Sequence, residues 1–216
     1  MAVVGILAAA GRGERLGTDV PKAFALCAGR PLLEWSLEVL ESACDRVVVA
    51  VPPDRTGAPD RVAGGDSRSE SVRAALRAAP EARIAVVHDA ARPLVTRELV
   101  EACVAAVDEG WDGAVAAARV SDTIKEAGAD ERVTRTLDRG MLWAVQTPQA
   151  FGADALRKAL EEADDTTLAA ATDDASLVEA AGGSVRVVEA LPDNIKVTSE
   201  LDLRVAEALL RARAAC

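Results

Sequence analysis

Apolar and polar positions follow two different spacings along the chain. Short apolar runs typical of buried strands are separated by longer segments whose apolar residues recur at helical spacing. The runs are Val3–Leu7, Val47–Val51, Ile84–Val87, Ala114–Ala117 and Val185–Val188, and the helical segments are Pro31–Ser42, Ser69–Ala79, Thr96–Glu109, Ala153–Glu162 and Asp173–Ala181. Strands that alternate with helices predict an α/β fold with a mostly parallel sheet and helices on both faces.

The helical spacing fails between residues 119 and 149. Three short extended segments surround a glycine turn there: Thr123–Lys125, Val133–Thr136 and Leu142–Val145, around Gly128. We interpret this stretch as a projecting β arm. Such an arm exposes apolar side chains, including Trp143, so it favours a homodimer in which a second copy covers it. The alternative is that the stretch folds back onto its own domain.

Further along, Ser199 and Asp202 have the spacing of a capping box, which predicts a last helix reaching about Arg213. A length of 216 residues fits a single domain over 1–216, with the arm as its only appendage.

The cysteines and the length of the apolar runs indicate the cellular compartment of the protein. Four cysteines, at positions 27, 44, 103 and 216, have no C-x-x-C spacing and no histidine nearby, which is typical of reduced thiols. The apolar runs are too short to span a bilayer, and the first residues do not read as a signal peptide. We therefore expect a cytoplasmic protein without a membrane partner.

The chain is acidic, with 25 basic and 35 acidic residues, a net charge of -10 and a pI near 4.7. This balance disfavours nucleic acid as a partner, so an anionic ligand needs a local cluster of cations. Most basic residues are arginine, and the four lysines are Lys22, Lys125, Lys158 and Lys196. Lys22 and Lys196 lie within motifs, whereas the other two are interpreted as solvated surface charges.

A glycine-rich loop follows the first predicted strand. Gly11 and Gly13 allow the backbone to approach a ligand closely, and Arg15 and Lys22 add positive charge. A dinucleotide fingerprint is excluded because Gly17 comes one residue late, and a Walker A loop is excluded because no Gly-Lys-Ser/Thr follows. The pattern favours a site for a polyphosphate; the alternative is a plain surface turn.

Two polar segments come after later strands, at the edge of the sheet where such folds bind ligands. Asp89 follows one strand, and a carboxylate there suits Mg²⁺ together with phosphate oxygens. The alternative is that Asp89 caps the next turn and pairs with Arg92. His88 is the only histidine, which excludes a multi-histidine metal site. In the segment Asp193–Thr198, we expect Lys196 to reach the same crevice.

The segment Gly64–Ser71 joins a strand to a helix and offers glycine, aspartate and serine groups to a base or sugar. A helix N-cap explains Asp66 and Ser69 equally well. We interpret the acidic pairs at 164–165 and 173–174 as charges at helix starts. With one histidine and no nucleophile elbow, the sequence does not favour a hydrolase triad.

Together these motifs resemble one family, 2-C-methyl-D-erythritol 4-phosphate cytidylyltransferase of the non-mevalonate isoprenoid pathway. The motifs, in order over nearly the whole chain, are Ala8–Gly17, Pro21-Lys22, Gly64–Asp66, His88–Pro93, Asp122–Lys125, Gln146–Gln149 and Asp193–Thr198. The resemblance implies a Rossmann-like fold with a dimerising arm. It also implies the transfer of the cytidylyl group of CTP to the sugar phosphate, with release of pyrophosphate and a need for Mg²⁺.

The resemblance further implies a role for individual residues. The expected catalytic residues are Arg15, Lys22 and Lys196; the CTP-binding residues are Ala9, Ala10, Gly11, Gly13, Gly65, Asp66 and Ser71; the residues for the sugar-alcohol phosphate are Asp89, Arg92, Thr123, Arg139 and Thr147; and Asp89 is the metal ligand. Arg139 is expected to reach the site of the partner subunit. Both reactants are anions, so alignment and fixed positive charge suffice without a general base.

Two alternatives stay open at this point. A sister enzyme that uses CTP with ribitol 5-phosphate would have a similar nucleotide loop, although the context of Thr123 and of Gln146–Gln149 favours the methylerythritol substrate. A nucleotide-binding protein without catalysis would have the crevice alone. Against it stands the joint presence of Arg15, Lys22, Asp89 and Lys196.

Overall fold

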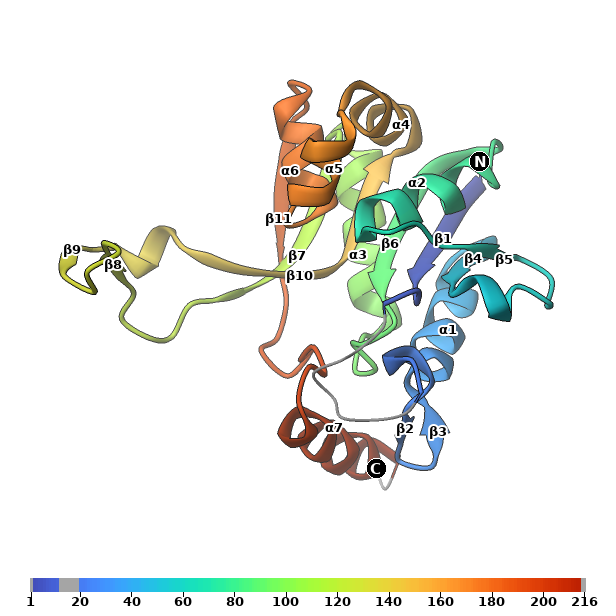
Figure 1. The fold of residues 1–216 in the computed structure, drawn as a ribbon, viewed down its shortest axis with the longest axis horizontal. Helices are drawn as coiled ribbons and strands as arrows, with labels where there is room; N and C mark the ends of the chain where they lie inside the picture. The colour runs from blue at the N-terminus through green and yellow to red at the C-terminus, as the bar shows by residue number, and fades with distance from the viewer. Residues whose placement is uncertain (1, 12–19, 215–216) are drawn as a thin grey trace.

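A mostly parallel sheet organises the protein, as the computed structural model shows for residues 2–11 and 20–214 (Figure 1). Within these residues the sheet has seven strands in the order β11-β7-β10-β6-β1-β4-β5. They are β1 (Ala2–Ala8), β4 (Arg46–Val51), β5 (Arg61–Ala63), β6 (Ala82–Asp89), β7 (Gly113–Arg119), β10 (Trp143–Gly152) and β11 (Val185–Glu189). Only β10 runs antiparallel to its neighbours, so the predicted fold class is confirmed.

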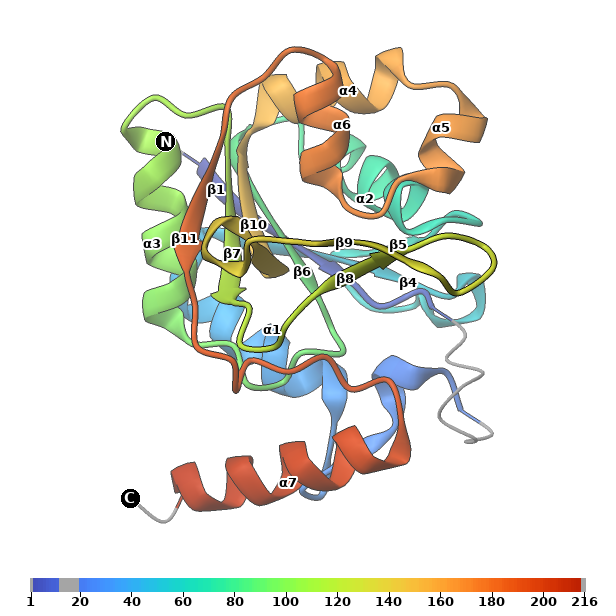
Figure 2. The ribbon, with the colours of Figure 1, turned by 90° about the vertical axis from the view of Figure 1, so that its left-hand side faces the viewer.

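Helices cover both faces of the sheet (Figures 1 and 2). On one face lie α1 (Leu32–Ala43) and α3 (Arg97–Asp108), and on the other lie α2 (Arg68–Arg77), α4 (Ala153–Glu162), α5 (Asp165–Ala170) and α6 (Asp174–Ala180). Apolar stripes predicted from the sequence make these contacts. Leu40 of α1 and Val100 of α3 are fully buried against one face, and Leu76 of α2 and Leu160 of α4 are buried against the other. Burial of such stripes is the main stabilising contribution to the fold.

A smaller layer sits below the carboxyl edge of the sheet (Figure 2). Here α7 (Glu200–Ala214) packs on a hairpin of β2 (Leu26–Cys27) and β3 (Arg30–Pro31), through Ala206 and Leu210. The N–H of Asp202 donates to Ser199 Oγ at 3.2 Å, and the N–H of Ser199 donates to Asp202 Oδ2 at 2.8 Å. The predicted capping box is therefore confirmed.

The β arm extends away from the sheet instead of folding back on it (Figure 1). It contains an antiparallel hairpin of β8 (Lys125–Ala127) and β9 (Val133–Thr136), followed by the 3-10 turn η4 (Arg139–Met141). The return segment is longer than predicted, because β10 begins in the arm and continues into the central sheet between β6 and β7. The peptide bond between Thr147 and Pro148 within β10 is cis.

Among residues 2–11 and 20–214, the structure also has the 3-10 turns η2 (Lys22–Phe24) and η3 (Pro53–Arg55). Cys27 and Cys103 are buried and Cys44 is half-buried, and all three are free thiols. Burial raises the pKa of Cys27 to about 11 and of Cys44 and Cys103 to about 12. These thiols therefore behave as small apolar side chains, as the sequence predicted. Cys216 lies outside the described residues. Of the helices described, none has the length and apolar character that a membrane span needs.

Candidate active site

A cleft of about 1000 Å³ opens at the carboxyl edge of the sheet, where β1, β4, β5 and β6 end. Ala9, Ala10 and Gly11 line one wall, and Gly65, Asp66 and Ser71 line another, so the described residues expected to bind CTP come together. Lys22 and Lys196 line the same cleft. Of the expected residues on this side, Gly13 and Arg15 lie outside the described residues.

Close contact between the two glycine-containing walls shapes the cleft. A Cβ atom at Gly64 would lie 2.3 Å from the Cβ of Ala10 and 2.8 Å from Ser71 Oγ, so only glycine fits. Ser71 Oγ accepts from the N–H of Gly65 at 3.1 Å and donates to Ser67 O at 2.9 Å. The Ser71 hydroxyl therefore holds the loop in place as well as lining the cleft.

The N-cap of α2 is Ser67, so the alternative that Asp66 or Ser69 caps this helix is wrong. Ser67 Oγ accepts from the N–H of Glu70 at 3.2 Å, and Glu70 Oε2 accepts from the N–H of Ser67 at 2.8 Å. Ser69 is buried, whereas Asp66 is exposed at the rim of the cleft, where it faces the space available to a ligand.

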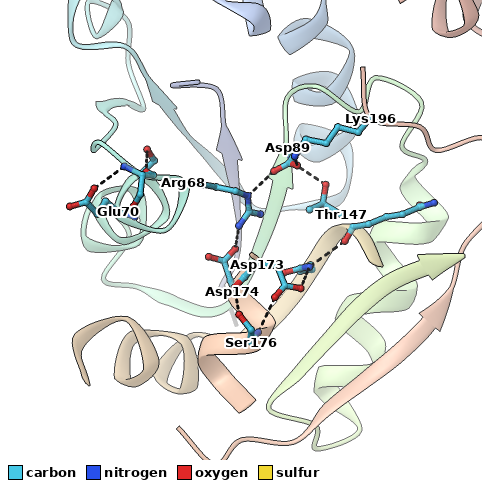
Figure 3. Close-up of polar contacts among 12 residues, drawn as sticks. Arg68, Glu70, Asp89, Thr147, Asp173, Asp174, Ser176 and Lys196 are labelled. Atoms are coloured by element: carbon cyan, nitrogen blue, oxygen red, sulfur yellow. Dashed lines mark hydrogen bonds and ion pairs between the residues drawn. The ribbon is translucent and has the colours of Figure 1, made fainter. Parts of the chain in front are cut away.

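Asp89 lies at the end of β6, between two cations (Figure 3). Arg68 Nε donates to Asp89 Oδ1 at 2.9 Å, and Lys196 Nζ lies 2.7 Å from Asp89 Oδ2. Burial acts to raise the pKa of Asp89, but the two cations outweigh burial and hold this pKa far below its ordinary value. The alternative ion pair with Arg92 is wrong, because Arg92 Nη1 instead donates to Asn194 O at 2.7 Å.

Arg68 is a site residue that the sequence did not single out. Its Nη1 donates to Oδ2 of Asp174 at 2.6 Å, so one guanidinium joins two buried carboxylates (Figure 3). Asp174 is fully buried, and burial raises its pKa. The prediction of helix-start charges is confirmed for both residues, because Asp173 caps α6 and accepts from the N–H of Ser176 at 3.0 Å, and Asp174 is the first residue of that helix.

A second pocket of about 290 Å³ adjoins the cleft. Arg68, Asp89 and Lys196 line both spaces and therefore form the wall between them. Arg92 and Thr147 line the smaller pocket, as the resemblance implied. Gln146 and Gln149 also line it and lie within a motif of the resemblance, although neither was assigned a role. Thr172 and Asp173 were missed as lining residues, since each looks like an ordinary polar residue in the sequence.

Residues 3–212 match the family model described as 2-C-methyl-D-erythritol 4-phosphate cytidylyltransferase. The chain belongs to this family. The predicted enzyme class, a CTP-dependent nucleotidyltransferase, is thereby confirmed.

Individual relatives agree with this assignment to the cytidylyltransferase family. A protein of that name from Frankia casuarinae is 44% identical over 219 residues, covering 96% of this chain and 81% of the relative. One from Saccharopolyspora erythraea is 42% identical over 227 residues, covering 97% and 100%. The crystal structure of the cytidylyltransferase from Thermus thermophilus superposes with a TM-score of 0.82 at 37% identity, over 98% of this chain and 100% of that one.

Two of the residues expected from this cytidylyltransferase family lie away from both spaces. Thr123 and Arg139 are exposed on the arm, and Arg139 donates through Nη1 to the backbone oxygen of Ser121. Neither lines the cleft or the smaller pocket of its own chain.

The described residues do not form a metal centre by themselves. No group of three or more histidine, cysteine, aspartate or glutamate side chains could hold an ion among residues 2–11 and 20–214. Asp89 is the carboxylate at the wall, and both of its oxygens are engaged by Arg68 and Lys196. A divalent ion at this wall would thus need phosphate oxygens and water for most of its ligands.

Proposed function

We propose that this cytidylyltransferase joins CTP and 2-C-methyl-D-erythritol 4-phosphate to give 4-diphosphocytidyl-2-C-methyl-D-erythritol and pyrophosphate, in isoprenoid precursor biosynthesis. The observation that carries the proposal is the wall of Arg68, Asp89 and Lys196 between a large cleft and a small pocket. The cleft has room for a nucleoside triphosphate, and the pocket suits a small polar substrate. The two reacting phosphates would meet at the wall.

In the reaction, an oxygen of the sugar phosphate attacks the α-phosphorus of CTP. The new P–O bond forms as the bond to the departing pyrophosphate breaks. Since the attacking phosphate is already deprotonated, the protein needs to align the two anions and to balance their charge. Lys22, Lys196 and Arg15 are the residues we assign to this task, with Arg92 and Thr147 holding the sugar phosphate.

Lys196 is suited to move between two partners. Its side chain is 41% exposed, and its ammonium lies 2.7 Å from Asp89 Oδ2. Arg68 is anchored by Asp174 and stays beside Asp89. Lys196 can therefore turn to the reacting phosphates while the buried carboxylate of Asp89 keeps one cationic partner. Asp89 then acts as a resting counter-ion for Lys196.

We propose that Mg²⁺ arrives with the nucleotide, as part of the substrate. The triphosphate supplies the hard oxygen ligands that this ion prefers, which the wall itself does not. Asp89 would supply at most one oxygen ligand to this ion, once Lys196 has turned to the phosphates.

We also propose that the enzyme is a cytoplasmic homodimer that assembles through the arm, without nucleic acid or membrane as partner. Val133, Met141 and Val145 expose 56%, 79% and 45% of their surface on or beside the arm, which favours cover by a second copy. An arm that crosses to the partner would bring Thr123 and Arg139 to the smaller pocket there. The net charge of -10 supports the absence of polyanionic partners.

Pyrophosphate release tests the function directly. The purified protein is incubated with CTP, Mg²⁺ and either 2-C-methyl-D-erythritol 4-phosphate or ribitol 5-phosphate. Release with the first substrate alone is the expected result. Release with ribitol 5-phosphate alone would assign the chain to the sister activity, and CTP binding without release in either reaction would indicate a binding protein.

A further inference from the structure

Asn194 lies where three segments of the smaller pocket meet, and it is only 3% exposed. Its side-chain Nδ2 donates to Gln146 Oε1 at 2.8 Å and to Thr147 O at 2.9 Å. Its backbone oxygen accepts from Arg92 Nη1 at 2.7 Å. One residue thus contacts both the middle of β10 and the turn after β6, while lining neither the cleft nor the pocket.

The carbonyl oxygens around Asn194 fix the orientation of its side-chain amide. Thr147 O is a backbone carbonyl that can only accept, so the nitrogen side of the Asn194 amide must face it. Gln146 Nε2 donates to the backbone oxygen of Leu191 at 3.3 Å, which turns Gln146 Oε1 toward Asn194. A group with two N–H donors and this short reach is therefore needed at position 194.

The three groups that Asn194 connects line the smaller pocket, which the proposed function assigns to the sugar phosphate. Thr147 and Arg92 line the smaller pocket, and Lys196 follows Asn194 by two positions along the chain. Thr147 Oγ1 also accepts from the N–H of Asp89 at 3.1 Å, so a displaced Thr147 would disturb the wall as well.

We propose that Asn194 is a positioning residue for the sugar-phosphate pocket. Its amide fixes Thr147, its backbone oxygen fixes Arg92, and its place in the chain sets Lys196 relative to both. The inference deepens the proposed function and rests on it, because it assigns the smaller pocket to the sugar phosphate. Displacement of positioning groups by about 1 Å can cost about a hundredfold in rate.

The test is the Asn194→Asp variant, which keeps the shape but places carboxylate oxygens against Thr147 O and Gln146 Oε1. We expect KM for the sugar phosphate to rise by about tenfold or more and kcat/KM to fall between about tenfold and a hundredfold. KM for CTP should stay within about twofold, because the nucleotide cleft has other walls.

The matched control is Asp112→Ala. Asp112 directly precedes β7, at the edge of the sheet opposite to the wall. Asp112 Oδ2 accepts from the N–H and from the Oγ of Ser184, both at 2.8 Å, so this variant also loses two hydrogen bonds but far from the wall. It should lower the Tm without raising either KM. If Asn194→Asp behaves like this control, or raises both KM values equally, the positioning role is wrong. If the unaltered protein releases no pyrophosphate with this sugar phosphate, the proposed function fails instead.

A second measurement does not depend on the folding of any variant. Asn194 is the only asparagine in the sequence, so labelling with ¹⁵N-asparagine yields a single side-chain NH₂ pair in an NMR spectrum. Titration of the unaltered protein with 2-C-methyl-D-erythritol 4-phosphate should shift that pair, and CTP should shift it less. A pair that does not move at saturating sugar phosphate would overturn the inference.

Discussion

The ammonium of Lys196 lies 2.7 Å from Oδ2 of Asp89, an ion pair that joins the segment after β11 to the end of β6. The two side chains come from elements on opposite sides of β10 in the sheet order, and both line the cleft and the smaller pocket. Together with Arg68, Lys196 compensates the buried Asp89 carboxylate at one wall of a protein with a net charge of -10. An anionic substrate at this wall therefore does not face an uncompensated carboxylate of Asp89.

Replacement of Lys22 or Lys196 by alanine should lower turnover by about a hundredfold or more while the fold persists, by analogy with the loss of one preorganised donor. Both lysines line the cleft, and Arg68 still neutralises Asp89 when Lys196 is absent. The measurement is pyrophosphate release at saturating CTP and sugar phosphate, with circular dichroism to check the fold.

Lys158→Ala is the control for the two lysine variants. Lys158 is exposed on α4, where it pairs with Glu162 only at 4.0 Å, so activity should be unchanged. Near-normal turnover in the Lys22 or Lys196 variant would show that the assigned charge is not needed.

Arg68→Met should destabilise the protein by about 3 kcal/mol, because it leaves the buried carboxylates of Asp89 and Asp174 without this partner. Asp174→Asn should cost less, since burial already raises the pKa of Asp174 and disfavours its charge. The double variant should therefore lose less stability than the sum of the two single variants, by about 1 kcal/mol or more. Urea unfolding at pH 7 measures all three.

Arg77→Met is the control for this series, because Arg77 is exposed at the end of the same helix, α2. It should change the free energy of unfolding by no more than about 0.5 kcal/mol. Strict additivity of Arg68→Met and Asp174→Asn would mean that the ion pair between them contributes nothing measurable.

The sequence predicted most elements because their apolar positions keep one spacing over a long stretch. The predicted range Ala153–Glu162 coincides with α4, and α1 and α3 differ from prediction by only one residue at each end. In contrast, α5 has six residues, too few for a helical period to be recognised. β10 was predicted only at its start, because its polar residues from Gln146 to Gln149 interrupt the strand pattern where they face the pocket.

The candidate site was predicted where a motif places residues next to each other in sequence. Ala9 to Gly11, Asp66 and Asp89 follow strand ends, and the parallel sheet brings those ends together. Arg68 and Asp174 were missed because their pairing depends on how α2 packs beside α5 and α6, which no local pattern reveals. The same holds for Asn194, whose three contacts come from segments far away in the sequence.

Gly64→Ala should raise KM for CTP by about tenfold and destabilise the protein by about 1 to 3 kcal/mol, as overpacking does. The added Cβ would meet Ala10 Cβ at 2.3 Å, so the two walls of the nucleotide cleft must separate. Gly57→Ala is the control, because a Cβ at Gly57 would meet nothing within 4 Å. Steady-state kinetics and urea unfolding compare the two variants, and an unchanged KM for CTP in Gly64→Ala would argue against nucleotide binding between these walls.

Asp202→Ala should lower the stability of the protein by about 1 kcal/mol at pH 7, because Asp202 caps α7. Hydrogen bonds from the Thr198 hydroxyl and backbone lower the pKa of Asp202 from 3.8 to about 2 in the folded protein. A lowered pKa means that the carboxylate stabilises the fold fully above about pH 4 and that this contribution is lost as the pH falls toward 2. Urea midpoints of the variant and the unaltered protein should therefore differ at pH 7 and converge near pH 2.

The exposed Glu200 provides the control for Asp202, because it begins the same helix and lies 4.0 Å from Arg204. Glu200→Ala should shift the urea midpoint only slightly at any pH, since exposed ion pairs contribute little. A gap between Asp202→Ala and the unaltered protein that stays constant from pH 7 to pH 2 would indicate that Asp202 stabilises α7 through packing and not through its charge. Convergence of the two urea midpoints, in contrast, would mean that the ionised carboxylate of Asp202 stabilises the layer of α7, β2 and β3.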